Sequence, residues 1–402
     1  MSLAAPVTGW IRRVPRPPLP AVGQWVTPAG WVAGAGAGAG LVLGGIEGWL
    51  ELRVLGLTFL LLLVAAGAWL LGRTSYDVVF DLHRERVTAG ETAGGRVVIR
   101  NRAGRSLFPT RIEMVVGKGR AQFTLPSLGR DEEHEQLFEI PTRRRGVITI
   151  GPVSSVRSDP LGLLRRTQTW ARSTDLYVHP VTVPLSNDST GFLRDIEGVT
   201  TQELSSNDVS FHALREYQPG DDRRAIHWRT TARVGRLMVR QFEETRRAHL
   251  LVVLPTGAAD YATEDDLESA ISIAGSLARH AFGLDREVSI HTTSGALSCT
   301  SGPLVLDRLA ELEPAERTVP VRDLAARAIA ASPQASVAVL VTGSEVDARD
   351  LRGAHRALPV SVPSFGLRCG RELTLTQRRL GDLTITDLPD VYALPRAMRS
   401  MR

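Results

Sequence analysis

The residues best suited to chemistry lie together near the middle of the chain, in FHALREYQPGDDRRAIHWRTTARVGRLMVRQFEE (residues 211–244). This block combines arginines, carboxylates, two histidines and a tryptophan. Three kinds of chemistry fit the mixture. Arginine–carboxylate pairs can form a structural or partner-facing network. The arginines can also bind an anion such as phosphate or nucleic acid. Finally, His212 or His227 can act with Asp221 as the acid/base pair of a hydrolase.

We favour the network, and therefore a protein that is not an enzyme. A histidine close to a carboxylate is most often structural, and the chain has no G-x-S-x-G nucleophile motif. The segment HEQLF at His134 lacks the second histidine of a zinc-protease helix. Nucleic acid is not an expected partner, because acidic residues are interspersed among the arginines and only Tyr217 and Trp228 offer rings for base stacking.

The block itself predicts a turn, a short helix and a strand. Pro219 fixes φ and Gly220 accepts a positive φ, so YQPGDD is typical of a turn. Asp221 or Asp222 is then expected to cap a helix over RRAIHWRTTAR, which Gly235 ends. The following RLMVRQFEE alternates polar and apolar residues and predicts a strand.

The composition limits the cofactors and the compartment. The chain of 402 residues has 48 basic and 43 acidic residues, yet Lys118 is its only lysine. Because no G-x-x-x-x-G-K-[ST] motif occurs, the chain is not itself expected to be a P-loop ATPase. Two cysteines, Cys299 and Cys369, cannot form a cysteine metal cage and are expected to stay unpaired in a reducing compartment. We expect no cofactor.

Two long apolar runs near the N-terminus predict a membrane anchor. The uncharged run Ala29–Ile46 and the run Val54–Gly72 each have about 18 to 20 residues, enough to cross the hydrocarbon as a helix. The small residues of the first run suit close helix packing in lipid. Residues 1–74 are therefore expected to form a two-helix membrane hairpin. Tryptophans near the ends of the runs match an aromatic belt: they are Trp25, Trp31, Trp49 and Trp69.

Arginines give the expected orientation of this hairpin. Arg12, Arg13 and Arg16 precede the first run, and Arg73 and Arg84 follow the second. The short connection between the runs carries two glutamates and a single arginine. The positive-inside rule then places both termini and the remaining domains in the cytoplasm of a multi-pass protein of the cell membrane.

The rest of the chain predicts two further folds, so the fold class is mixed. Residues 75–180 contain short alternating runs separated by Gly, Pro, Asn and Asp, which favours an all-β, Ig-like sandwich. From His249 onward, apolar strands alternate with amphipathic helices, as is typical of an α/β domain. The late segment DLTITDL is expected to add an edge strand. The predicted organisation is an anchor (1–74), a sandwich (75–180), a signature block (181–245) and an α/β domain (246–402).

The signature block resembles the family called domain of unknown function 58. Its hallmark is similar to F-x-x-L-R-E-Y-x-x-G-D-x-x-R-x-I-H-W-x-x-x-A-R-x-G-x-L-x-V-R-x-F/Y-E. The segment RRRGVITIGPVSSVRSDPLGLLRR (143–166) and the two-span hairpin are also similar to the family. The matching residues are Phe211, Leu214, Arg215, Glu216, Tyr217, Gly220, Asp221, Arg224, Ile226, His227, Trp228, Ala232, Arg233, Gly235, Leu237, Val239, Arg240 and Glu243.

The resemblance implies a role and a site. It implies a membrane-anchored scaffold or adaptor with a von Willebrand factor type A-like (Rossmann-like) domain. The implied partners are a MoxR-type AAA+ ATPase of a chaperone system and membrane lipid. The block then serves as a signature or interaction site with no catalytic residue. Its expected members are Arg215, Glu216, Tyr217, Gly220, Asp221, Arg224, His227, Trp228, Arg233 and Arg240.

One departure from this resemblance predicts a degenerate metal site. A metal-binding type A domain presents D-x-S-x-S after its first strand, and the oxygens of that motif hold Mg²⁺. Here LLVVL is followed by Pro255 in place of the aspartate, and Gly257 and Ala259 replace the serines. Thr256 alone cannot hold the ion, and Asp260 comes one or two residues too late. We therefore predict that no metal binds at this loop.

Overall fold

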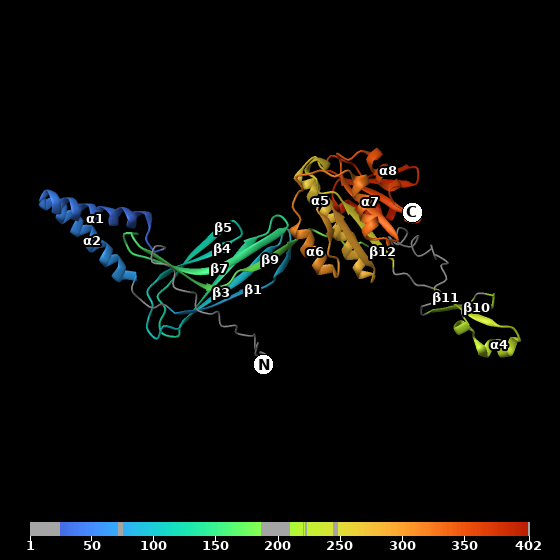
Figure 1. Cartoon of the computed structure of the whole chain (residues 1–402), viewed down its shortest axis with the longest axis horizontal. Helices are drawn as coiled ribbons and strands as arrows, with labels where there is room; N and C mark the ends of the chain where they lie inside the picture. The colour runs from blue at the N-terminus through green and yellow to red at the C-terminus, as the bar shows by residue number, and fades with distance from the viewer. Residues whose placement is uncertain are drawn as a thin grey trace. The chain divides into compact units, whose positions relative to one another are not determined.

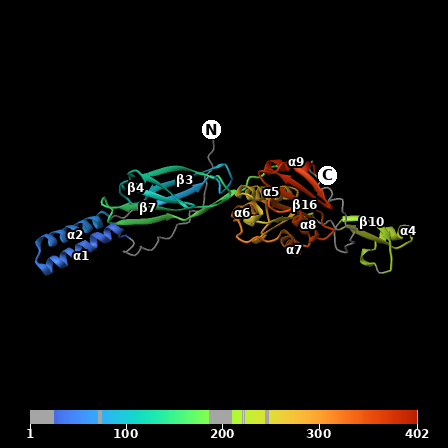
Figure 2. The ribbon, with the colours of Figure 1, turned by 90° about the horizontal axis from the view of Figure 1, so that it is seen from above.

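A computed structural model describes residues 25–70, 75–185, 210–219, 221, 223–243 and 248–400 of the chain. The chain divides into two compact units, Met1–His179 and Pro180–Arg402. Figures 1 and 2 show the elements of both. Each unit is built around its own buried core, so each is described by itself.

The first unit begins with a pair of apolar helices, α1 (Pro28–Glu47) and α2 (Leu50–Leu70). Thr27 caps α1 by accepting a hydrogen bond from the amide of Gly30 at 3.1 Å, and Gly48 ends it in the left-handed conformation. Both helices are long and apolar enough to cross a membrane. The predicted pair of apolar helices is therefore confirmed.

Small residues let the two helices approach closely. A Cβ atom added at Gly40 would lie 2.9 Å from Cα of Gly56, and one added at Gly56 would lie 2.7 Å from the amide nitrogen of Leu41. Contacts this short leave room only for hydrogen, as in the small-residue interfaces of membrane helices. On the outside of the pair, large apolar side chains such as Val64 and Leu61 are exposed, as lipid-facing residues would be.

The β-rich region of the first unit contains two sheets that share one core. The three-stranded sheet has the order β1-β3-β6, and the six-stranded sheet has the order β2-β9-β7-β4-β5 with β8 paired to β7. Buried side chains from both sheets, among them Ile99 and Ile150, form one cluster. The predicted β-rich region is thus confirmed. The strands are β1 (Tyr76–Leu82), β2 (Arg86–Thr88), β3 (Thr92–Asn101), β4 (Thr110–Val116), β5 (Gly119–Leu125), β6 (Glu133–Pro141), β7 (Gly146–Ser158), β8 (Arg165–Ala171) and β9 (Thr174–His179).

Backbone hydrogen bonds fasten the helix pair to the turn between β7 and β8. The amide of Thr27 donates to the carbonyl oxygen of Leu163 at 3.1 Å, and the amide of Arg165 donates to the carbonyl oxygen of Trp25 at 2.7 Å. The guanidinium of Arg166 lies 5.2 Å from the ring centre of Trp25, within range of a cation–π contact. The end of the β-rich region that carries this turn therefore lies next to the helices.

The second unit contains a seven-stranded sheet with the order β14-β13-β12-β15-β16-β18-β17. Its five inner strands are parallel, and β14 and β17 pair antiparallel at the edges. The strands are β12 (His249–Leu254), β13 (Glu287–Thr292), β14 (Gly295–Leu297), β15 (Val337–Gly343), β16 (Ser364–Cys369), β17 (Thr376–Leu380) and β18 (Leu383–Leu388).

Helices cover both faces of this sheet. They are α5 (Glu264–Gly283), α6 (Gly302–Glu311), α7 (Val321–Ala331), α8 (Ala348–Arg356) and α9 (Leu394–Ser400), with short 3₁₀ turns η4 (Ala258–Asp260) and η5 (Val391–Ala393). Along β12, Leu250 and Val252 pack in the cluster with α5, whereas Leu251 and Val253 pack in the cluster with α7 and α8. This alternation explains the continuous apolar run of the strand, because both of its faces are buried. The predicted α/β region is confirmed.

Two sequence-based expectations for this region have clear outcomes. DLTITDL forms β18, which lies between β16 and β17, so the expectation that it adds an edge strand is wrong. The edge is β17, whose exposed polar residues gave no strand signal. Cys299 and Cys369 are both unpaired, as predicted.

Candidate functional site

The central block folds as a small module of its own elements. We use the term hairpin module for the described residues between 210 and 243. Strands β10 (Ser210–Glu216) and β11 (Met238–Glu243) pair antiparallel. A 3₁₀ turn η3 (Arg223–Ala225) and helix α4 (Trp228–Val234) lie in the connection between them.

A small apolar contact and two backbone bonds hold the connection onto the strands. Ile226 forms an isolated bridge with Val239, and both side chains are buried. The amide of His227 donates to the carbonyl oxygen of Met238 at 2.8 Å. In return the amide of Met238 donates to the hydroxyl of Thr231 in α4 at 3.0 Å. The module is therefore internally braced although its core is small.

The strongest polar contact in the module joins Arg215 to Asp221. Nη1 and Nη2 of Arg215 donate to Oδ2 and Oδ1 of Asp221 at 2.7 and 2.6 Å, so the pair is bidentate. Oδ2 of Asp221 also accepts from the amide of Gln218 at 2.8 Å. These contacts close the turn after β10. An arginine is required here, because only its planar fork matches both carboxylate oxygens.

The helix cap differs from the predicted one. Asp221 is committed to Arg215 and Gln218, and α4 is instead capped by His227, whose Nδ1 accepts from the amide of Thr230 at 3.3 Å and lies 2.7 Å from its hydroxyl. Gly235 ends the helix in the left-handed conformation, as predicted. Asp222, the alternative cap, lies outside the described residues. The helix begins later than predicted because η3 occupies its first residues.

The described contacts of Asp221 and His227 do not join these two side chains. Across the described part of the module, no hydrogen bond links them, and each bonds other groups of the module. The side chain of His212 is not among those described.

The other expected site residues lie mainly on the surface of the module. Exposed Glu216 pairs with Arg236 at 3.6 Å, and the amide of Tyr217 donates to the carbonyl oxygen of Leu237 at 2.8 Å. Gly220 is outside the described residues. Further exposed side chains are those of Arg224, Trp228, Arg233 and Arg240.

An exposed apolar patch accompanies these charges. We define it as Trp228, Val234 and Leu237, which are exposed, with Trp228 at 65%. The sequence reasoning named Trp228 as a site residue but missed the other two. Val234 is the last residue of α4 and Leu237 lies two residues after Gly235; this position at the end of a short helix is the signal that could have identified them.

Ionisation of Asp221 gives this module a pH dependence. The hydrogen bonds from Arg215, and then that from Gln218, lower the pKa of the Asp221 carboxyl. Because this pKa is lowered, the pair contributes its full stabilisation to the module at pH values above the ordinary aspartate pKa of about 3.9. The contribution is lost as the pH falls through the lowered pKa of Asp221.

We therefore expect the amide of Gln218 to be protected from hydrogen exchange at neutral pH and to lose protection in acid. NMR-detected exchange of the full chain between neutral and acidic pH checks this. Asp221→Asn removes the titrating group. In this variant the Gln218 amide should exchange faster at neutral pH, and its protection should no longer fall when the solution is made acidic. An Asp221 carboxyl that titrates at the ordinary value would contradict the pairing.

The loop after β12 carries the segment that is predicted to be a degenerate metal motif, and its shape differs from the expected one. The η4 turn brings Asp260 back, so that its Oδ2 lies 2.7 Å from the position of a Cβ added at Gly257. Asp260 is thus close to the motif although it comes late in the sequence. The Thr256 hydroxyl and Oδ2 of Asp260 are buried without a hydrogen-bond partner among the described residues, and burial raises the pKa of Asp260.

Two such oxygens fall well short of the octahedral shell that Mg²⁺ demands. We accordingly expect the melting temperature of the second unit to stay unchanged when Mg²⁺ is added to the full chain, as measured by calorimetry. A rise in melting temperature that Asp260→Asn abolishes would instead assign an ion to this loop.

Comparisons with known proteins identify one family. The model of the family described as Protein of unknown function DUF58 matches residues 213–299. The predicted resemblance is confirmed for this part of the chain. The protein YeaD of Bacillus subtilis, itself described as uncharacterized, is 25% identical over 218 residues, which cover 50% of this chain and 52% of the relative. The chain thus spans about half the length of the curated relative it matches.

Similarities to solved structures are weak. The CARDB domain of a Pyrococcus furiosus protein, in complex with di-metal ions, is 16% identical with a TM-score of 0.21 and covers 26% of this chain and 93% of that chain. A beta-glucosidase from Listeria innocua in complex with isofagomine is 13% identical with a TM-score of 0.20, covering 26% of this chain and 16% of that chain. Scores this low carry no argument about fold or function.

Proposed function

We propose, from the DUF58 match over residues 213–299, that the chain is a membrane-anchored, cytosol-facing adaptor whose hairpin module docks a protein partner. The partner class that the family resemblance implies is a MoxR-type AAA+ ATPase. The single observation that carries the docking proposal is the exposed patch of Trp228, Val234 and Leu237 on a module that is braced without them. Exposed tryptophan beside arginine is the composition enriched in protein interfaces.

The charges of the module support a protein partner over a nucleic acid. Arg215 and Arg236 already face the carboxylates Asp221 and Glu216. An anion-binding surface would leave its arginines open to the ligand, whereas here two of them serve contacts inside the module. A hydrolase based on Asp221 and His227 has no support, since each is bonded elsewhere.

The membrane part of the proposal depends on helices α1 and α2. Their apolar length supports two spans. The arginines that would set the orientation, Arg12, Arg13, Arg16 and Arg73, lie outside the described residues. Arg84, which follows the second helix, is described, exposed and compatible with a cytoplasmic side.

The two finer fold assignments belong to the same proposal. Two sheets around one core, antiparallel except where β2 pairs parallel with β9, support an Ig-like sandwich for the first unit. A mostly parallel sheet covered on both faces supports a von Willebrand factor type A-like domain for the second. Both architectures serve binding in many proteins, so they agree with an adaptor without specifying its partner.

A pull-down tests the adaptor role directly. The full-length chain in detergent is immobilised and offered a MoxR-type ATPase from the same genome, with ATP, with ADP and without nucleotide. We expect nucleotide-dependent capture, because the two nucleotide states of such an ATPase differ in shape. An absence of capture in all three states would count against the ATPase. Nucleic-acid capture that falls steeply with salt would favour the anion-binding alternative.

A further inference from the structure

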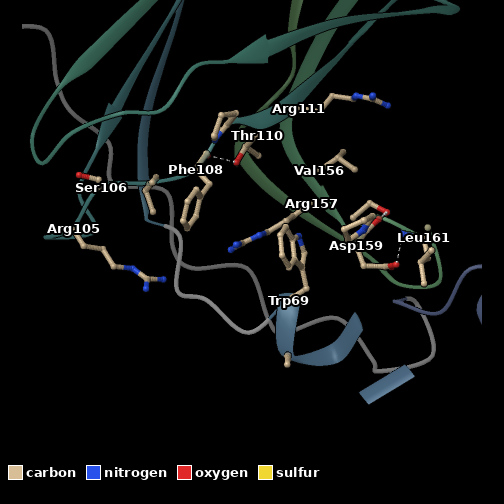
Figure 3. A pocket seen from close by; sticks show the side chains of 16 residues that line it. Trp69, Arg105, Ser106, Phe108, Thr110, Arg111, Val156, Arg157, Asp159 and Leu161 are labelled. Carbon is tan, nitrogen blue, oxygen red and sulfur yellow. Dashed lines mark hydrogen bonds between the residues drawn. The ribbon is translucent and has the colours of Figure 1, made fainter. Parts of the chain in front are cut away.

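A large pocket opens at the end of the β-rich region that lies next to the helices. Its volume is about 880 Å³, and all of its lining residues belong to the first unit. Trp69, the second-last residue of α2, lines it together with Phe108 from the β3–β4 connection and Arg157 from the end of β7. Figure 3 shows these side chains around the pocket.

The pocket is positively charged. Arg105, Arg111 and Arg157 line it, and none of the three forms an ion pair with a carboxylate in the part of the chain that the structure describes. The carboxylate in the lining, Asp159, is already committed to the backbone: its Oδ2 accepts from the amide of Leu161 at 2.9 Å and its Oδ1 from that of Leu164 at 2.6 Å.

The nearby carboxylate on β4 is also occupied. Both oxygens of Glu113 accept from Nη2 of Arg165, at 2.8 and 2.9 Å. Figure 3 shows that Arg111 points away from Arg105 and Arg157, so Arg105 and Arg157 are the two arginines that can meet an anion in the pocket. Guanidinium groups bind phosphate oxygens in a bidentate manner, which suits them to this ligand better than lysine would be.

Apolar side chains flank the charge. Phe108 is 77% exposed, and Leu161 and Trp69 are also largely exposed. Such residues are costly to leave in water but favourable at the boundary between lipid headgroups and acyl chains. Trp69 ends an apolar helix long enough to span the bilayer, so the pocket lies at that boundary if α2 crosses the membrane.

We propose that this pocket binds the headgroup of an anionic membrane lipid, with its phosphate held by Arg105 and Arg157 and its acyl chains against Phe108 and Leu161. The inference rests on the membrane-anchored part of the proposed function and is independent of the ATPase. The pocket size falls within the roughly 300–1,000 Å³ that ligand sites usually have. The flanking apolar residues select a lipid over free phosphate, because an inorganic ion gains nothing from them. The lipid would fix the base of the β-rich region against the cytoplasmic leaflet, where anionic lipids concentrate.

The test measures lipid binding to the full chain in detergent by native mass spectrometry. Dioleoylphosphatidylglycerol and dioleoylphosphatidylcholine are titrated separately. We expect the wild-type chain to bind the anionic lipid more tightly. Each arginine near an anionic lipid contributes about a 5-fold factor, so Arg105→Gln and Arg157→Gln together should weaken phosphatidylglycerol binding about 25-fold. Phosphatidylcholine binding should change little.

A matched control removes the same charge elsewhere. Because β4 and β7 run antiparallel, Arg120 and Arg143 lie at the opposite end of the strands from the pocket. Replacing these two by glutamine should leave the lipid preference unchanged. An equal loss in both double variants, or equal binding of the two lipids by the wild type, would overturn the proposal.

An additional variant and a competition experiment guard against misfolding and against binding of free phosphate. Should the double variant of the pocket fail to fold, as judged by its thermal unfolding, the single variant Arg105→Gln at an exposed position should still lose about 5-fold in phosphatidylglycerol affinity. Inorganic phosphate should not displace the lipid; displacement by phosphate at comparable concentration would assign the site to the free ion and overturn the lipid. ATPase capture by the pocket variants reports separately on the adaptor role, since their hairpin module is unchanged.

Discussion

Replacing Trp228 by alanine is expected to weaken ATPase binding by about 30-fold or more, the loss of about 2 kcal/mol that defines an interface hot spot. The side chain is 65% exposed, so its indole contributes little to the fold of the module but offers a large apolar surface to a partner. Titration of the full chain against the ATPase, by surface plasmon resonance, measures this effect. Thermal unfolding of the variant should match that of the wild type.

Control variants separate a docking surface from a general loss of apolar area. Tyr392 in η5 is 68% exposed in the same unit, and Tyr392→Ala should leave the affinity unchanged. Leu237→Ala, which removes a smaller part of the patch, should have an intermediate effect. Equal losses for Trp228→Ala and Tyr392→Ala, or no loss for either, would remove the patch from the proposed function.

Alanine at Gly343 is expected to destabilise the second unit by about 3 kcal/mol, at the upper end of the usual cost of overpacking a buried site. Gly343 ends β15, and a Cβ atom there would overlap the carbonyl oxygen of Asp260 and lie 2.6 Å from the ring of Tyr261. The loop cannot move away easily, because the Tyr261 hydroxyl donates to the carbonyl oxygen of Pro255 at 2.6 Å. Chemical denaturation of the full chain, followed by a signal from the second unit, measures the loss.

The matched control is another glycine of the same unit. A Cβ at Gly353 in α8 would meet only side-chain atoms of Arg322, at 3.8 and 3.9 Å. Gly353→Ala should therefore stabilise the helix by up to about 1 kcal/mol, because alanine has the higher helix propensity. If Gly343→Ala were as harmless as Gly353→Ala, the close contact of Asp260 and Tyr261 with Gly343 at the end of β15 would be incorrect.

Local sequence patterns predicted the parts of the fold that depend on neighbouring residues. An unbroken apolar run specifies a membrane-length helix whatever surrounds it, and α1 and α2 follow the two runs. Alternation located most strands of the β-rich region, because one face of each strand is buried. Pattern failed for β17, whose residues are mostly exposed, because pairing with β18, rather than burial of a side chain, makes this strand.

For the candidate site, the sequence identified the residues but not their contacts. The mixture of arginine and carboxylate indicated a structural network, and Arg215 with Asp221 is such a pair. The predicted helix cap was wrong, because an aspartate before a helix can serve either a cap or a turn, and the arginine on β10 decides in favour of the turn.

The sequence by itself determined two apolar helices long enough to span a membrane, the order of a β-rich and an α/β region, and the resemblance to the DUF58 family, whose model matches residues 213–299. These features depend on residue type and on spacing along the chain. Only the tertiary structure decided that Trp228, Val234 and Leu237 are exposed, and that Arg105 and Arg157 line one pocket with Trp69. Exposure and shared pockets depend on contacts between residues far apart in the chain, and no local pattern encodes those distances.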